Sequence, residues 1–300
     1  MMPEEDWLTG LDNSSVEQEL SLVLRALDPC LREPVFWTGV PVQYGHHEGV
    51  FIVGADALML RHPTGAFRLS VSGMGAQMLC DGLHLQMPTP LMIDRIWENA
   101  IVRVKPKTYT PDSSGRVHVQ DRSGRDITVS MSGLAAMIAH SDRVNEFAGD
   151  PTRLMCNVGK WWVICKALSG QAHSANHGDS YRCANYGWFD AGAPGLSVTG
   201  KHIWQSIGTR HNQHHRDYSQ TFVPIGSRML VDGIVMPVSD VLVNPELAGL
   251  ISHEGALPFA RHPNLPVSQL TGACNISPDP HQVQVRIYAP DEAPTHPGGD

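Results

Sequence analysis

Apolar residues recur at intervals of three and four positions in four segments of the chain, and this spacing predicts amphipathic helices. The segments are 14–27, 74–85, 90–100 and 134–147. The third has the clearest start, because Thr89 can cap the helix and Pro90 suits its first turn. Its apolar side chains are expected to face the core, while Asp94 is expected on the opposite, polar face.

Other runs are rich in apolar, β-branched and aromatic residues and are bounded by turn residues, so they predict strands. They cover residues 40–44, 49–60, 66–72, 160–168, 181–189 and 228–236. The run Lys160–Leu168 is the most strand-like of them and is expected to form a central strand. Asp232 and Gly233 predict a hairpin turn inside the last run.

These elements together predict an α+β fold, with a mainly antiparallel central sheet and helices packed on one side. Residues 1–289 are expected to form one domain, because no shift in composition marks a boundary; a division near residue 130 is the alternative. Residues 290–300 are expected to be a disordered tail.

Composition narrows the classes of protein to consider. Of 300 residues, 42% are hydrophobic, which is enough for a substantial core. The formal net charge of −8, without any run of Lys and Arg, argues against a nucleic-acid partner. No stretch approaches the roughly 18 apolar residues of a membrane span. Residues 1–7 are acidic where a signal peptide is basic, so we expect no membrane association and a cytoplasmic location.

Six cysteines are scattered along the chain without a Cys-x-x-Cys pair, and reduced thiols are therefore expected. A nucleophilic Cys–His pair is a minor alternative for Cys156, Cys165 or Cys183.

The segment Gly208–Ser219 holds the densest group of proton-transfer and metal-binding side chains. As an extended strand it places alternate residues on one face, namely His211, Gln213, His215, Asp217 and Ser219. As a helix it instead groups His211, His214, His215 and Tyr218. The local composition is poor in strong helix formers and favours the extended form.

The extended form suggests hydrolysis or acyl transfer at an amide or ester bond of a small or peptide-like substrate. His211 or His215 is the expected general base, Asp217 orients the imidazole, and Ser219 or an activated water is the nucleophile. Side chains expected to help bind the substrate are His140, His173, His177, Trp188 and Tyr218. In the structural alternative, Asp217 and Ser219 only brace a turn.

Two further hypotheses stay open. His211, His214 and His215 have spacings that suit a zinc or non-haem iron site, which would make the protein a metal-dependent enzyme. The tryptophans and the Asn- and His-rich loops could instead line the pocket of a non-enzymatic ligand-binding protein.

Two blocks of sequence resemble a set of uncharacterised bacterial proteins. The first block holds Ala76-Gln77, Pro88-Thr89 and Ile93-Asp94-Arg-Ile-Trp97, and is similar to that set's Ala-Gln, Leu-Pro-Thr and Val-Asp-x-Ile-Trp pattern. The second holds Tyr186-Gly-Trp188, His211 and Asp217-Tyr-Ser219, and is similar to Tyr-Gly-Trp-His and Asp-Tyr-Ser-His-Gly.

The resemblance covers residues 40 to 255 and implies a site around the second block, without implying a reaction. The chain departs from the pattern at Phe189 and Gln220, where histidines are expected. These two departures imply that any chemistry of those histidines is altered or lost here.

Overall fold

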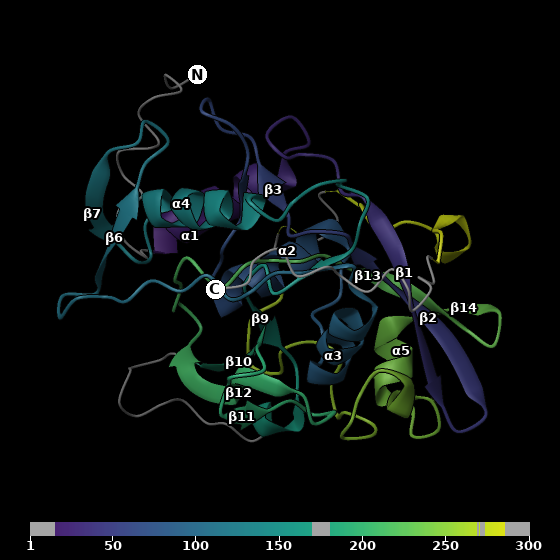
Figure 1. Ribbon diagram of the computed structural model, residues 1–300. Coiled ribbons are helices and arrows are strands. Elements are labelled where there is room, and N and C mark those ends of the chain that lie inside the picture. Colours follow the sequence, from purple (N-terminus) through teal and green to yellow (C-terminus); the bar gives the residue numbers. More distant parts are fainter. Residues whose placement is uncertain (1–15, 170–180, 269, 271–273, 286–300) are drawn as a thin grey trace.

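The computed structural model describes residues 16–169, 181–268, 270 and 274–285 (Figure 1). Within these residues, 24% helix and 29% strand with antiparallel sheets confirm the α+β fold. The helices are α1 (Val16–Leu27), α2 (Gly73–Leu83), α3 (Pro90–Asn99), α4 (Leu134–Asn145) and α5 (Val238–Val243). The expected disordered tail at 290–300 lies outside the described residues.

Two four-stranded antiparallel sheets organise the described residues. The first has the order β1 (Trp37–Tyr44), β2 (His47–Gly54), β13 (Ile225–Val231) and β14 (Ile234–Pro237). The second has the order β11 (Gly195–Leu196), β12 (His202–Asn212), β10 (Arg182–Phe189) and β9 (Lys160–Val163).

Three short strand pairs complete the set. They are β3 (Met59–Leu60) with β4 (Phe67–Arg68), β6 (Arg116–Gln120) with β7 (Asp126–Ser130), and the parallel pair β5 (Val102–Arg103) with β8 (Met155–Cys156).

The strands expected in one central sheet are therefore divided between two sheets. Helix α3 contacts β1 of the first sheet and β10 of the second, and Figure 1 shows it between them. The hydrogen-bonded strand orders keep the two sheets separate, and α3 packs against a strand of each.

The expectation of a central strand at Lys160–Leu168 was wrong, because β9 ends at Val163 and lies at the edge of its sheet. Its apolar side chains are buried by other elements: Trp162, for example, donates its indole N–H to the Val71 carbonyl at 2.7 Å. The free edge of β9 is covered by the loop after β12, because Lys160 N donates to Ser219 O at 2.6 Å. An apolar run thus indicates that a strand is buried. The burial can come from other elements and does not require a neighbouring strand on each side.

Other local predictions are confirmed. Thr89 caps α3 by accepting a hydrogen bond from Met92 N at 3.2 Å, and Pro90 occupies its first turn. Asp232 and Gly233, with φ of 50° and 80°, form the tight turn between β13 and β14. No helix among the described residues has the length and apolar character needed to cross a membrane.

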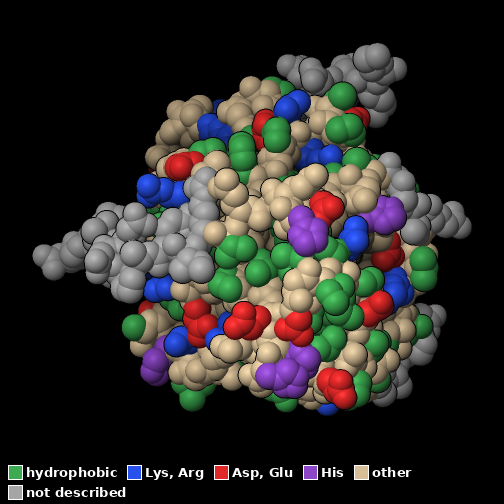
Figure 2. Space-filling view, turned by 90° about the vertical axis from the view of Figure 1, so that its right-hand side faces the viewer, with side chains coloured by type: hydrophobic (Ala, Val, Ile, Leu, Met, Phe, Trp, Pro, Cys, Tyr) green, Lys and Arg blue, Asp and Glu red, His purple; other side chains and the backbone are tan. Residues whose placement is uncertain are grey.

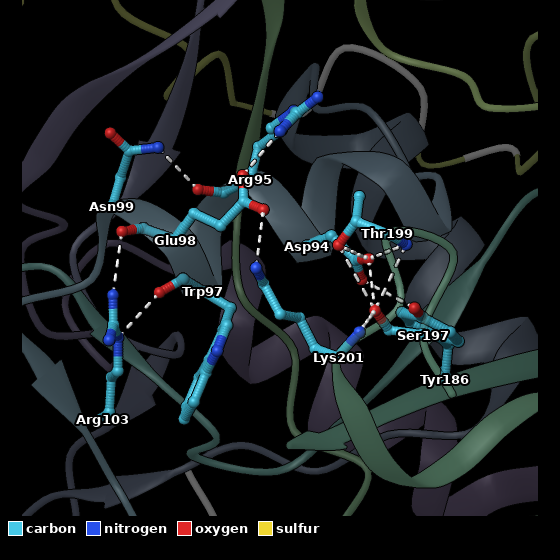
Figure 3. Close-up of polar contacts among 10 residues, drawn as sticks. All are labelled: Asp94, Arg95, Trp97, Glu98, Asn99, Arg103, Tyr186, Ser197, Thr199 and Lys201. Atoms are coloured by element: carbon cyan, nitrogen blue, oxygen red, sulfur yellow. Dashed lines mark hydrogen bonds and ion pairs between the residues drawn. The ribbon is translucent and has the colours of Figure 1, made fainter. Parts of the chain in front are cut away.

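Asp94 was expected on the polar, outward face of α3, and this expectation was wrong because its side chain is fully buried. Tyr186 Oη donates to one carboxylate oxygen at 2.6 Å, and the other accepts from Ser197 Oγ at 2.7 Å and from the Thr199 backbone N at 2.8 Å (Figure 3). The Thr199 hydroxyl adds a fourth bond at 2.7 Å. Asp94 therefore joins α3 to β10 and to the turn between β11 and β12.

We predict that Asp94→Ala lowers the free energy of unfolding by about 3–5 kcal/mol, because it leaves several buried donors unpaired. Chemical denaturation followed by circular dichroism measures the change. The exposed Asp126→Asn is the control and is expected to stay within about 0.5 kcal/mol of wild type. A loss below about 1 kcal/mol for Asp94→Ala would contradict the joining role.

Candidate functional site

Strand β12 ends at Asn212, and the residues after it form a turn, so neither the extended nor the helical form describes the whole segment. The turn brings His215 back over His211, and their imidazole rings stack with centroids 3.7 Å apart and planes at 8°. Both side chains are partly exposed, whereas the residues from Arg216 to Thr221 are buried. The imidazole pair therefore lies at the surface end of a buried polar segment.

Asp217 is the centre of this segment and is only 4% exposed. Lys160 Nζ lies 3.3 Å from its Oδ2, and His215 Nε2 lies 3.7 Å from the same oxygen. Burial raises the pKa of the Asp217 carboxyl, but its contact with His215, the charge of Lys160 and hydrogen bonds from Ser219 outweigh burial and lower the pKa well below its usual range. Asp217 is therefore a carboxylate at neutral pH.

Lys160 is a site residue that the sequence analysis missed. It stands at the start of β9, 57 positions from Asp217 in sequence, and its ammonium lies 5.1 Å from the ring centroid of Trp188. A lysine at the start of an otherwise apolar strand is a signal of a buried charge. No local pattern in the sequence indicates which carboxylate pairs with it.

The backbone at Trp188 is unusual, because this bulky residue has a φ of 66° and follows Gly187 with a φ of 142°. A left-handed conformation is costly for a large side chain and is often retained where it places a group for function. Here it accompanies the placement of Trp188 beside Lys160 and in the same apolar cluster as Tyr218.

Ser219 contacts the carboxylate and not an imidazole. Its backbone N donates to Asp217 Oδ1 at 2.7 Å, and its hydroxyl makes a short hydrogen bond to the same oxygen. A serine nucleophile needs a base that removes its proton, and no imidazole contact of Ser219 occurs among the described residues. This geometry matches the alternative in which Ser219 braces the turn.

The expected substrate-binding residues are only partly placed. Tyr218 and Trp188 pack in one cluster against α4, and the ring of His140, from that helix, lies 5.2 Å from the Tyr218 ring. His173 and His177 lie outside the described residues.

The histidines at the site differ in their surroundings. Burial, together with the charges of His215 and Lys160, lowers the pKa of His211 to about 4 against the opposing charge of Asp217. Burial, followed by the charge of Arg68, lowers the pKa of His140 to about 3. Both imidazoles are neutral at neutral pH.

The three histidines considered for a metal site do not act as one group. His214 Nε2 lies 2.9 Å from the side-chain nitrogen of Gln213, while His211 and His215 stack face to face. Among the described residues, no group of three or more His, Cys, Asp and Glu side chains is placed to hold a metal ion. The zinc or iron hypothesis stays a prediction, since His173 and His177 are not described.

The two positions that depart from the bacterial pattern have different environments. Phe189 is buried and stacks on Trp97 with centroids 4.8 Å apart, away from the imidazole pair. Gln220 is fully buried beside Asp217, and its Oε1 accepts a hydrogen bond from Asp217 N at 2.8 Å. Gln220 therefore belongs to the site.

The cysteines considered as nucleophiles are buried thiols. Burial raises the pKa of Cys156 and Cys183 to about 12 and that of Cys165 to about 11. A thiol is nucleophilic only when it ionises, so these environments disfavour the Cys–His alternative.

A separate groove of about 940 Å³ lies beside β1, β2 and α3, and its lining includes Glu48, Arg95 and Glu98. Arg95 pairs with Glu98 at 2.6 Å. Figure 2 shows the face on the right-hand side of Figure 1, where acidic, basic and apolar side chains are interspersed. Because the arginine of the groove is already paired, the groove has fewer groups placed for catalysis than the surroundings of Asp217.

Comparisons of the chain with protein-family models, with curated proteins and with solved structures found no match. The resemblance to the bacterial set therefore stays a prediction, and the site rests on its own geometry.

We predict that acid weakens the fold through His140. Its pKa is about 3 in the folded protein and near 6.5 when unfolded, so the contribution is complete above about pH 6.5 and is lost as the pH falls towards 3. In denaturant titrations between pH 6 and 4.5, His140→Gln should reduce the pH slope of the unfolding free energy by about 1.4 kcal/mol per pH unit.

The exposed His281→Gln serves as the matched control and should keep the wild-type slope. An unchanged slope in His140→Gln would mean that His140 does not titrate abnormally.

Proposed function

We propose that the chain is a hydrolase that cleaves an amide or ester bond of a small or peptide-like substrate, with water as the nucleophile and His215 as the general base. The observation that carries this proposal is the position of His215 between the buried Asp217 carboxylate and the neutral imidazole of His211. A carboxylate close to a histidine is a common way to stabilise the imidazolium that forms when the histidine acts as a base.

In the first step, His215 takes a proton from water while the water oxygen attacks the carbonyl carbon. The imidazolium that forms is stabilised by Asp217, whose Oδ2 lies 3.7 Å from His215 Nε2. His215 then returns the proton to the leaving nitrogen or oxygen as the bond to carbon breaks. The proton that His215 takes from water in the first step is thus transferred to the leaving group in the second.

The site supports water better than Ser219 as the nucleophile. The Ser219 hydroxyl is buried and donates to Asp217, so its proton is directed towards the carboxylate. The imidazole rings of His211 and His215, in contrast, are partly exposed, although His215 Nε2 itself is buried beside Asp217. Ser219 then has a positioning role, since its two hydrogen bonds hold the Asp217 carboxylate in place.

The position of Lys160 also supports the proposal. Its ammonium compensates the charge of Asp217, which would otherwise be costly to bury. Lys160 Nζ and His215 Nε2 lie beside the same Asp217 oxygen, so the proposed reaction has a positive charge close to its general base.

We predict that His215→Gln lowers kcat/KM for p-nitrophenyl acetate and a panel of p-nitroanilides by about 100-fold or more, because it removes a general base. The matched control is His214→Gln, which removes the adjacent imidazole that contacts Gln213 instead of Asp217. This control should retain activity within about threefold of wild type. Equal losses in the two variants would contradict the role of His215.

We also predict that hydrolysis survives dialysis against a chelator, and that the dialysed protein carries no stoichiometric zinc or iron by elemental analysis. Loss of activity on chelation, restored by one of these metals and abolished in His211→Ala, would select the metal-dependent alternative instead.

A further inference from the structure

Buried polar side-chain atoms without a hydrogen-bond partner in the described part of the chain include His140 Nε2, His215 Nε2 and Thr221 Oγ1. They also include Trp188 Nε1 and Gln220 Nε2, whose residues contact Lys160 and Asp217, and both amide atoms of Asn185. Trp188, Gln220 and Asn185 are 8%, 0% and 1% exposed. Buried polar atoms are nearly always paired, so several unpaired ones on neighbouring elements point to a ligand that pairs them.

These side chains adjoin the proposed centre. The Trp188 ring lies beside Lys160, and the Gln220 side chain binds the backbone N of Asp217. Asn185 lies on β10 opposite Trp162 of β9 and Gly208 of β12, and its Oδ1 is 3.3 Å from where a Cβ of Gly208 would stand. The Gln205 amide nitrogen lies 2.8 Å from the same Cβ position, so the side chains of Asn185 and Gln205 both approach the backbone at Gly208.

The unpaired atoms of Trp188, Gln220 and Asn185 are of two kinds. Trp188 Nε1 and Gln220 Nε2 carry N–H donors, and Lys160 adds an ammonium whose one hydrogen bond among the described residues goes to Asp217. Donors of this kind suit a carbonyl oxygen. The side chain of Asn185 offers both a donor and an acceptor, and its acceptor suits an N–H group.

The charges around these atoms favour a neutral ligand. Lys160 and Asp217 compensate each other, and the imidazoles of His140 and His211 are neutral at neutral pH. An extra carboxylate would lie close to that of Asp217 without a cation of its own. A neutral group with a C=O and an N–H satisfies both the hydrogen bonding and the charge.

We propose that Trp188, Gln220 and Asn185 bind an amide group, so that the bond cleaved at this site is an amide rather than an ester. This inference rests on the proposed hydrolase function. An ester has the carbonyl oxygen but no N–H, so it leaves the Asn185 acceptor unpaired, which is a costly loss at a buried site.

The test uses the full chain labelled with ¹⁵N, and follows the indole N–H resonances during titration with acetamide, methyl acetate or sodium acetate. Trp188→Phe keeps an aromatic ring and assigns the Trp188 resonance by its loss. Trp204, which is 52% exposed, reports non-specific solvent effects. We expect acetamide to shift the Trp188 resonance with saturation in the millimolar range, and at least fivefold more tightly than methyl acetate.

Asn185→Leu is the second variant, since it keeps the volume of the side chain and removes its amide. It should abolish the preference for acetamide over methyl acetate. If Trp188→Phe does not fold, the rise in melting temperature with each probe, compared between wild type and Asn185→Leu, gives the same comparison without assignment.

Equal affinities for acetamide and methyl acetate would overturn the inference, as would tightest binding of acetate or no saturable shift. These outcomes are distinguishable from failure of the proposed function. Selective binding of acetamide, without hydrolysis of any ester or anilide substrate by the wild type, would retain the amide site and remove the hydrolase.

Discussion

The burial of one carboxylate, that of Asp217, is the constraint on which the candidate site depends. A buried charge is tolerated only when it is paired and hydrogen-bonded. Asp217 meets this requirement with Lys160 from β9, His215 from its own loop and two hydrogen bonds from Ser219. The same contacts hold the loop after β12 against the edge of the second sheet. The contacts that pair the Asp217 charge therefore also determine the shape of the site.

A comparison with Asp94 explains why Asp217, and not this second buried carboxylate, is assigned to chemistry. The partners of Asp94 are hydroxyls and a backbone N–H, all supplied by β10 and the turn after β11, and the carboxylate is fully buried. These contacts explain a role in joining elements. Asp217 instead contacts an ammonium and a partly exposed imidazole, which are groups that can exchange protons or stabilise developing charge.

The sequence predicted those features whose cause is local. Thr89 and Pro90 determine the start of α3, and Asp232-Gly233 determines the hairpin between β13 and β14. His211, His215, Asp217 and Ser219 were named as one group because they are close in the chain. Their proximity is confirmed, although the turn after Asn212 brings the two imidazoles together in a way that a regular strand would not.

The features that the sequence did not predict depend on contacts between distant residues. Lys160 is placed by its pairing with a carboxylate 57 positions away, and no local pattern indicates that partner. Helical spacing shows which residues share a face of a helix, but it does not show how many other elements pack against that helix. Asp94 was therefore expected to face solvent. Helix α3 contacts both sheets, and Asp94 is buried although it lies on the polar face, whereas Arg95 and Glu98 on that face stay partly exposed.

The most direct test of the account is a double-mutant cycle on Lys160 and Asp217, with unfolding free energies measured for wild type, Lys160→Met, Asp217→Asn and the double variant. If the two charges form the buried pair described here, the losses of the single variants should not add, and the coupling energy should be at least about 1 kcal/mol. Additive losses, within about 0.3 kcal/mol, would contradict the pairing and with it the organisation of the site.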